Sequence, residues 1–286
     1  MVIARSKYDK TLMRVRRIGR TPLDVLDRAG EQMSFYTRAI GWSPRTVRRY
    51  KGEVLRLLAE VSFGTGALAV IGGTIGVIVM MTIAVGVVVG LQGAAGLDEL
   101  GTSALTGFLT AYFNTREIAP LIAALAMSAV VGCGFTAQLG AMRISEEIDA
   151  LEVMAVPSLP FLVTTRMLAG FVAIIPLYVI GLLGSYLGSR FIATMFLGQS
   201  SGTYDHYFNL FLPPQDVLYS FGKVLVFAFV LILIHCVYGY TASGGPAGVG
   251  VAVGRAVRAA IVTIMVLDFF LSLAIWGTTT TVRVAG

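Results

Sequence analysis

The sequence predicts an all-α integral membrane protein with five transmembrane helices. Hydrophobic residues make up 56% of its 286 residues and charged residues only 13%, which leaves too few polar side chains to cover a water-soluble domain of this length. The chain also contains long stretches with few or no charges, each with the roughly 20 apolar residues that a helix needs to cross a bilayer. These stretches predict membrane spans at 65–92, 117–142, 165–189, 218–241 and 259–277.

Basic residues are concentrated near the N-terminus. Residues 1–56 hold 14 lysines and arginines against 5 aspartates and glutamates, whereas the remaining 230 residues hold 8 against 11. Because positive charge accumulates on the cytoplasmic side of membrane proteins, we expect the N-terminus to lie in the cytoplasm. Five spans then place the C-terminus on the opposite, outer side.

Residues 1–60 are expected to form a basic tail and two interfacial helices on the cytoplasmic leaflet, ahead of a membrane domain at 61–286. Thr21-Pro22 and Ser43-Pro44 have the form of helix starts, with a hydroxyl N-cap followed by proline. An apolar stripe follows each start, with cations beside it that can face anionic headgroups. The same cations could bind nucleic acid, but in a chain with five spans we expect no nucleic-acid partner.

A short acidic helix is predicted at 144–156, on the cytoplasmic side between the second and third spans. Ser145 is placed to cap its N-terminus, Glu146 and Glu147 fall in its first turn, and Pro157 and Pro160 stop it. Ile148, Leu151 and Met154 share one side of the helix, and Glu146, Asp149 and Glu152 share the other. The residues of this segment that could couple to a soluble partner are Arg143, Ser145, Glu146, Glu147, Ile148, Asp149, Leu151, Glu152 and Met154.

Two interpretations of this acidic helix remain open. It is either a solvated surface helix, whose charges only keep it out of the bilayer, or a docking helix for a soluble partner. A metal site is not expected, because no histidine lies nearby and carboxylates alone at this spacing make a poor cage.

Small and polar residues inside the spans mark further candidate sites. Gly86 and Gly90 are four residues apart, the spacing that lets helices approach closely, and a substrate-facing groove is the alternative. Asp268 is the only charge in the fifth span, and an isolated carboxylate there must face the bundle or a wet cavity. Its partner could be Arg166 or a backbone donor, or it could act in substrate passage. His235 in the fourth span is expected to be packed and hydrogen-bonded.

The sequence carries no pattern typical of an enzyme. It contains no phosphate-binding loop motif and no spacing of a nucleophile with a base, so we expect no catalytic residue, no cofactor, and ATP hydrolysis only on a separate subunit. The glycine-rich stretch 244–250 is expected to be a flexible cytoplasmic connector. Cys133 and Cys236 lie inside spans, so no disulfide is expected.

Three functional classes fit these features. The first is a permease driven by a separate ATPase, and the second is an ion-coupled secondary transporter that uses Asp268. The third is a purely structural membrane scaffold. A secondary transporter would show internal repeats, which the sequence lacks.

Several motifs resemble a known family. They are the run at 116–120, the run Thr136-Ala137-Gln138-Leu139-Gly140-Ala141-Met142-Arg143, the run at 147–157, Gly90-Leu91-Gln92-Gly93 and Leu267-Asp268-Phe269. Together they resemble the signature of the MlaE/YrbE permeases, the membrane subunits of ABC-type lipid transport systems that work with MCE proteins. The acidic sequence EEIDALEVM and the C-terminal sequence VRVAG are most similar to those of actinobacterial (mycobacterial) YrbE subunits of the B type.

The resemblance implies an assembly. A second YrbE-type permease would complete a heterodimer, a cytoplasmic ABC ATPase dimer would dock on the coupling helix at 144–156, and MCE proteins would lie on the outer side. The substrate would be a lipid such as a fatty acid, phospholipid or sterol. The membrane would be the bacterial inner membrane, with the N-terminus cytoplasmic and the C-terminus periplasmic. The lipid-path candidates are Gly86, Gly90, Gln92, Gln138, Met142 and Asp268.

The chain departs from the family pattern at two places. The stretch 129–134 lacks the arginine that the family commonly carries in the second span, and Gln138 stands where the family often has glutamate. Both departures remove a charge from membrane depth, where ionisable groups are costly and usually functional. They fit a subunit whose heterodimeric partner retains the charges.

Overall fold

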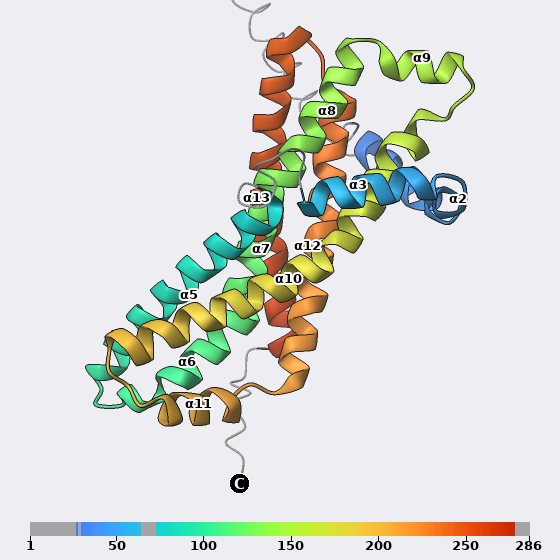
Figure 1. Ribbon diagram of the computed structural model, residues 1–286. Helices are drawn as coiled ribbons and strands as arrows, with labels where there is room; N and C mark the ends of the chain where they lie inside the picture. The colour runs from blue at the N-terminus through green and yellow to red at the C-terminus, as the bar shows by residue number, and fades with distance from the viewer. Residues whose placement is uncertain (1–26, 28–29, 64–72, 278–286) are drawn as a thin grey trace, which may run out of the picture.

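The structure, a computed structural model, describes residue 27, residues 30–63 and residues 73–277, and this part of the chain is helical with no strand (Figure 1). Five helices in it are long and apolar enough to cross a membrane. They are α5 (Thr74–Asp98), a continuous helix over Ser103–Ile144, another over Leu159–Phe196, α12 (Pro214–Tyr240) and α13 (Gly245–Trp276). The predicted all-α fold with five spans is confirmed.

The second and third spans are each built from several helical segments. The second contains η1 (Ser103–Leu105), α6 (Thr106–Phe113), η2 (Asn114–Ile118), α7 (Ala119–Met127), η3 (Ser128–Gly132) and α8 (Cys133–Ile144), and the third contains η4 (Leu159–Thr164), α10 (Thr165–Phe191) and η5 (Ile192–Phe196). The segments η2 to η5 are π-helical. Turns of this kind are rare and often lie at functional sites.

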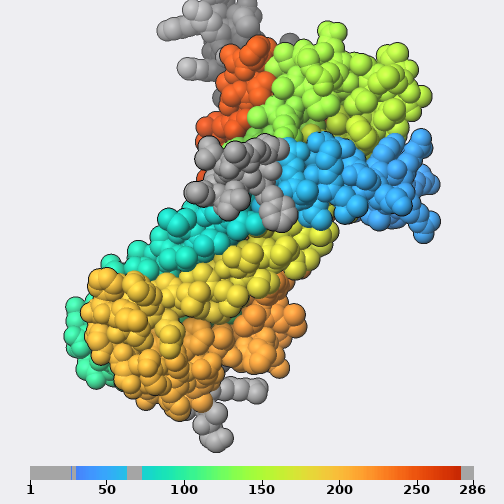
Figure 2. All heavy atoms as spheres, in the orientation of Figure 1, coloured from blue at the N-terminus to red at the C-terminus, as the bar shows by residue number. Residues whose placement is uncertain are grey.

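Shorter helices lie at the two ends of the bundle. Figure 1 places α9 (Glu147–Val153) at one end and α11 (Ser201–Leu210) at the other. Residues 30–41, α2 (Ser43–Arg49) and α3 (Lys51–Phe63) lie toward the α9 end, and Figure 2 shows them in blue beside the green segment that carries α8 and α9. The end of the bundle that carries α9 is therefore also the end where the N-terminal helices pack.

The N-terminal helices pack on the bundle. Ala39 and Leu57 are fully buried, and the Thr164 hydroxyl donates a hydrogen bond of 3.0 Å to the Ala39 carbonyl. A helix does begin at Ser43-Pro44, but the predicted hydroxyl cap is wrong, because Trp42 occupies the N-cap position and its side chain makes no capping hydrogen bond. The helix start predicted at Thr21-Pro22 lies outside the described residues.

The ends of the spans differ from the prediction because charged residues lie inside the helices. The second span was expected to begin at Glu117, but the helix begins at Ser103. Arg116 is only 6% exposed, so its charge sits within the bundle and does not mark the helix end. The stretch 244–250 is not a connector either, since α13 begins at Gly245 and includes most of it. Residues 65–72 of the predicted first span lie outside the described residues.

Spans one and three pack tightly through α5 and α10. A Cβ atom added at Gly86 would overlap the Ser185 carbonyl oxygen of α10. The Ser189 hydroxyl donates a hydrogen bond of 2.8 Å to the Gly86 carbonyl and accepts one of 2.7 Å from the Asn114 side-chain amide. These contacts support the packing interpretation of the Gly86/Gly90 pair, because small residues let two backbones come close enough to exchange such bonds.

Gly86→Leu is expected to destabilise the protein. The new side chain has no room against α10, and overpacking of this kind typically costs about 1–3 kcal/mol. Thermal unfolding in detergent measures the change as a lower Tm. The matched control is Gly96→Leu on the same helix, where an added Cβ meets no heavy atom within 4 Å. Equal Tm values for the two variants would contradict the packing role of Gly86.

Candidate functional site

The acidic helix α9 is held between two sharp corners of the backbone. Glu146, directly before it, has a φ of 63°, and Ala155, after it, has a φ of 58°. Residues other than glycine rarely adopt this left-handed conformation, and they do so where the surroundings enforce it. In Figure 1, α9 projects sideways from the end of α8, so these corners fix its direction relative to the span.

The N-cap prediction at Ser145 is wrong. Ser145 is the C-cap residue of α8, and Glu146 occupies the position before α9. The Ser145 hydroxyl lies 3.0 Å from the Ala141 carbonyl and 2.8 Å from Glu147 Oε1, both of which can accept its proton. The chain turns between two helices within two residues, so the serine closes the first helix instead of opening the second.

The apolar side of α9 is divided between the bundle and the exterior. Ile148 is fully buried and Leu151 packs partly against the core. Met154, predicted to lie with them, is 65% exposed because the helix ends at Val153, which is itself 87% exposed. Two apolar residues thus anchor α9, and two others face outward, as do the exposed acids Glu146 and Glu147 at the start of the helix.

The remaining polar residues of α9 tie it to its surroundings. Arg143 Nη1 lies 2.7 Å from Asp149 Oδ1 in a partly exposed ion pair. The Ser158 hydroxyl donates a hydrogen bond of 2.6 Å to Glu152. Tyr240 at the end of α12 lies 2.8 Å from the same serine oxygen, and since the serine proton goes to Glu152, the tyrosine must donate. Side chains along α9 are therefore fixed to neighbouring elements.

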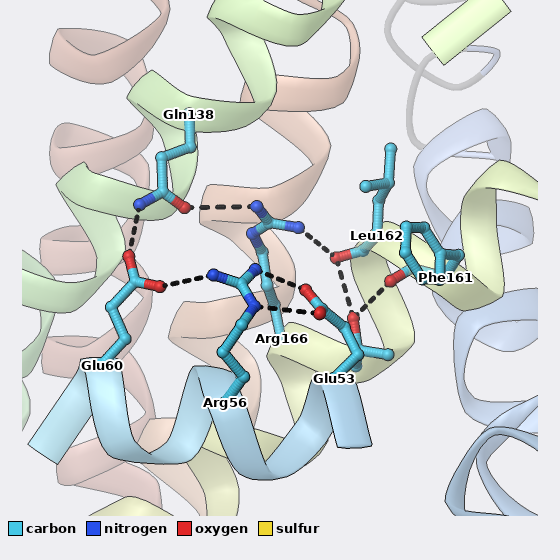
Figure 3. Close-up of polar contacts among 8 residues, drawn as sticks. Glu53, Arg56, Glu60, Gln138, Phe161, Leu162 and Arg166 are labelled. Carbon is cyan, nitrogen blue, oxygen red and sulfur yellow. Dashed lines mark hydrogen bonds and ion pairs between the residues drawn. The ribbon is translucent and has the colours of Figure 1, made fainter. Parts of the chain in front are cut away.

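Gln138 and Met142 lie on α8, the helix that leads into α9. Met142 packs partly buried against the core. Gln138 contacts Glu60 of α3 and Arg166 of α10, as Figure 3 shows. Arg166 is thus a neighbour of Gln138, and the expectation that it partners Asp268 is wrong.

Asp268 pairs with Lys223 of α12. The Lys223 ammonium is fully buried and lies 2.8 Å from Asp268 Oδ1. It donates hydrogen bonds to the Ser272 hydroxyl at 2.7 Å, the Arg116 carbonyl at 2.8 Å and Glu117 Oε2 at 3.1 Å. Asp268 Oδ1 accepts no hydrogen bond from the described residues, so its ion pair with Lys223 is its main polar contact there.

A second ion pair lies beside the first. Arg116 Nη2 is 2.7 Å from Asp216 Oδ2, with both side chains buried, and the Trp276 indole donates a bond of 2.9 Å to Asp216 Oδ1. The Arg116 guanidinium also lies 4.2 Å from the ring centre of Tyr112. We call Arg116, Glu117, Asp216, Lys223 and Asp268 the charged cluster. It joins spans two, four and five and contains three carboxylates against two cations.

A hollow of about 400 Å³ opens on the charged cluster. Glu117, Asp268 and Ser272 line it together with aromatic residues such as Tyr112, Phe269 and Trp276. Polar groups that converge in a partly apolar hollow are typical of a ligand site. Lys223 was not predicted as a site residue, although it falls inside the span predicted at 218–241 and a lysine within an apolar run predicts a buried acidic partner.

The other predicted path residues lie elsewhere. Gln92 lines a hollow of about 760 Å³ at the α11 end, with Asp98, Gln199 and Thr203. Gly86 and Gly90 face α10. The path candidates therefore occupy the two ends and the middle of the bundle, and their contact with lipid stays a prediction.

His235 has the packed, hydrogen-bonded environment that was expected. Its Nε2 lies 2.9 Å from the Ser128 hydroxyl and its Nδ1 2.8 Å from the Thr136 hydroxyl. Within the described residues, His, Cys, Asp and Glu form no group of three that could hold a metal ion.

The comparisons with known proteins agree with this architecture. A probable ABC transporter permease protein of Rickettsia bellii is 29% identical over 196 residues, covering 68% of this chain and 76% of its own. A protein of the same description from Synechocystis is 29% identical over 188 residues, covering 66% of this chain and 72% of its own. The chloroplastic protein TRIGALACTOSYLDIACYLGLYCEROL 1 of Arabidopsis thaliana is 28% identical over 199 residues, covering 70% of this chain and 57% of its own.

The family described as Permease MlaE matches residues 63–274, which takes in all five spans as far as Ala274 of the last. The match also includes α9 and every residue of the charged cluster. This chain is a multi-pass membrane protein that belongs to the MlaE permease family.

Proposed function

We propose that this chain is the permease subunit of an ATP-driven lipid transporter and that α9 is the coupling helix that docks on the ATPase. The observation that carries the proposal is the presentation of α9, whose inner side is anchored while Glu146, Glu147, Val153 and Met154 face outward. A fixed helix that combines exposed acids with exposed apolar side chains suits a soluble protein partner. The relatives described as ABC transporter permeases support an ATPase partner.

Charge reversal on α9 is expected to abolish ATPase binding. Glu146→Lys, Glu147→Lys and Asp149→Lys together replace three acids with cations and repel a basic partner surface. The measurement is co-purification of the ATPase with the tagged permease from membranes. The control is the double variant Asp98→Lys with Glu99→Lys. Both residues are exposed at the C-terminal end of α5, and this variant should retain the ATPase. Undiminished ATPase in the triple variant would refute the docking role.

A lipid substrate is supported by the chemistry of the charged cluster and by one relative. Lipids present a polar headgroup on apolar chains, and the hollow beside Asp268 combines carboxylates, a serine and aromatic side chains. The Arabidopsis relative carries the name of a galactolipid. The pairing of Asp268 with Lys223 gives that carboxylate a structural partner, which favours the ATP-driven class over an ion-coupled transporter.

Lys223→Met is expected to unfold or strongly destabilise the permease. It leaves Glu117 and Asp268 without their cation, and removing one partner of a buried ion pair typically costs about 3–5 kcal/mol. The double variant Lys223→Met with Asp268→Asn removes one of the stranded charges and should recover part of the loss. Thermal unfolding in detergent checks both variants, and a double variant no more stable than the single one would contradict the pairing.

A second permease is supported by the uneven burial of the spans. Only 11% of the most apolar stretch of α13 and 28% of that of α5 is buried within this chain, against 56% for the second span. Large apolar side chains on α13, such as Val262, Phe269 and Phe270, are more than half exposed. We propose that another YrbE-type permease covers part of this surface, with MCE proteins on the outer side. The same proposal places the complex in a bacterial inner membrane, with a cytoplasmic N-terminus and a periplasmic C-terminus.

Native mass spectrometry of the complex extracted from its own membrane is expected to show two different permease chains, an ATPase dimer and bound lipid. Expression of this chain without the second permease should lower its yield, because α5 and α13 then lack their protein partner. A stable homodimer that retains lipid would argue against the heterodimer. The mass of the bound lipid also identifies the substrate class.

A further inference from the structure

Helix α3 carries a row of charges, in which Glu53 and Glu60 are partly buried and Arg56 between them is exposed. Glu53, Arg56 and Glu60 follow one another at helical spacing, and Arg56 donates bonds of 3.0 and 2.6 Å to Glu53 and of 3.4 Å to Glu60. The hydrogen bonds from Arg56 lower the pKa of the Glu53 carboxyl below its ordinary value, so that this carboxylate stays ionised. Glu60 is left with one oxygen for a partner on another helix.

That partner is Gln138. Its Nε2 donates a bond of 2.9 Å to Glu60 Oε1, and its Oε1 accepts a bond of 3.2 Å from Arg166 Nη2 (Figure 3). A carboxylate only accepts hydrogen bonds and a guanidinium only donates them. The amide fits between the two because one end donates and the other accepts. The partners also fix which way the amide points.

Arg166 depends on this contact. It is 5% exposed, its Nη1 donates a bond of 2.9 Å to the Leu162 carbonyl, and Gln138 is the one side chain among the described residues that accepts a bond from it. In that part of the chain no carboxylate lies within 4.0 Å of its guanidinium. Glu53 and Glu60 act on it from farther away.

Two of the three bonded residues, Gln138 and Arg166, lie on the helices that come before and after α9 in the sequence. Gln138 lies on α8, which leads into α9, and Arg166 lies on α10, which follows it. The bond between them joins the two legs of the hairpin that carries α9, and Glu60 adds α3 to the same point. We propose that Gln138 is a positioning residue that fastens α3 to both legs of this hairpin, so that α3 moves with α9. The inference rests on the proposed role of α9 as the coupling helix.

The variant Gln138→Glu would make the attachment depend on pH. An ionised carboxylate at this position can still accept from Arg166, but it repels Glu60 and has no proton to donate to it. When two carboxylates share a site, one of them has a strongly raised pKa, and a proton held there restores the donor. Attachment of α3 in this variant is therefore present at low pH and lost as the pH rises. The charged groups nearest the position are Glu53, Arg56 and Glu60 on α3 and Arg166 on α10. The helices that pack against α8 also carry titratable or charged groups, namely His235 and Cys236 on α12 and Arg255 and Arg258 on α13.

The experiment measures the distance between α3 and α9 in the complex, reconstituted in lipid nanodiscs. Spin labels go on Leu55→Cys and Val153→Cys, which replace residues 62% and 87% exposed, in a background with Cys133→Ala and Cys236→Ala. With Gln138 the distance distribution should be one narrow peak at about pH 8 and about pH 5, because glutamine does not titrate. Gln138→Glu should lose the narrow peak at the higher pH and regain it at the lower. Gln138→Leu should lack it at both.

Controls keep the outcomes distinct. Gln215→Glu, an exposed glutamine at the start of α12, should behave like the unsubstituted chain at both pH values. A narrow peak in Gln138→Glu and Gln138→Leu at every pH would overturn the proposal, since apolar packing would then hold α3 alone. With Gln138 in place, ATP and vanadate should leave the distance between positions 55 and 153 unchanged, and a shift would show that α3 and α9 move separately. The pH comparison needs no ATPase, so it remains decisive even if the docking role of α9 fails.

Discussion

A charge inside an apolar bundle has to be matched by an opposite charge or a dipole close to it, and the polar interior of this protein follows from that requirement. Lys223 is surrounded by two carboxylates, a serine and a carbonyl oxygen. Arg166 is matched by an amide and a carbonyl, with carboxylates one step farther away. Each arrangement ties together helices that are distant in the sequence. In lipid, apolar side chains alone give little preference for one neighbouring helix over another, so these polar contacts help to specify which helices pair.

The fold could be predicted from composition and charge because five long apolar stretches leave few alternatives to five spanning helices. The limits of the spans were harder, since charges were treated as markers of helix ends. Arg116 breaks that rule because its partner Asp216 comes from a distant segment. The partners of Lys223, Glu117 and Asp268, are equally distant in the sequence. Only the folded chain brings such residues together, so their pairing is not visible in local spacing.

The candidate site shows the same division between local and distant information. The existence and place of α9 followed from local features, namely its acids, its apolar residues and the prolines after it. The exact ends of α9 could not be predicted from local features, because the left-handed backbone at Glu146 and Ala155 determines where the helix begins and ends. Ser145 and Met154 lie just outside it for that reason. Gln138 looked like the loss of a functional charge when seen alone. Beside Glu60 and Arg166 it is the side chain whose donor and acceptor match both neighbours.

The second span is one uninterrupted run of helical backbone from Ser103 to Ile144. At about 1.5 Å per residue, its 42 residues reach roughly 60 Å, about twice the thickness of the hydrocarbon core. The chain enters α9 directly from one end of this helix, and the charged cluster holds it farther along at Arg116 and Glu117. It can therefore act as a lever with its load at one end and its fulcrum within the membrane. From Glu117 to Ile144 the helix extends roughly 40 Å at about 1.5 Å per residue. A tilt of about 5° around the charged cluster would therefore carry the α9 end through roughly 3.5 Å.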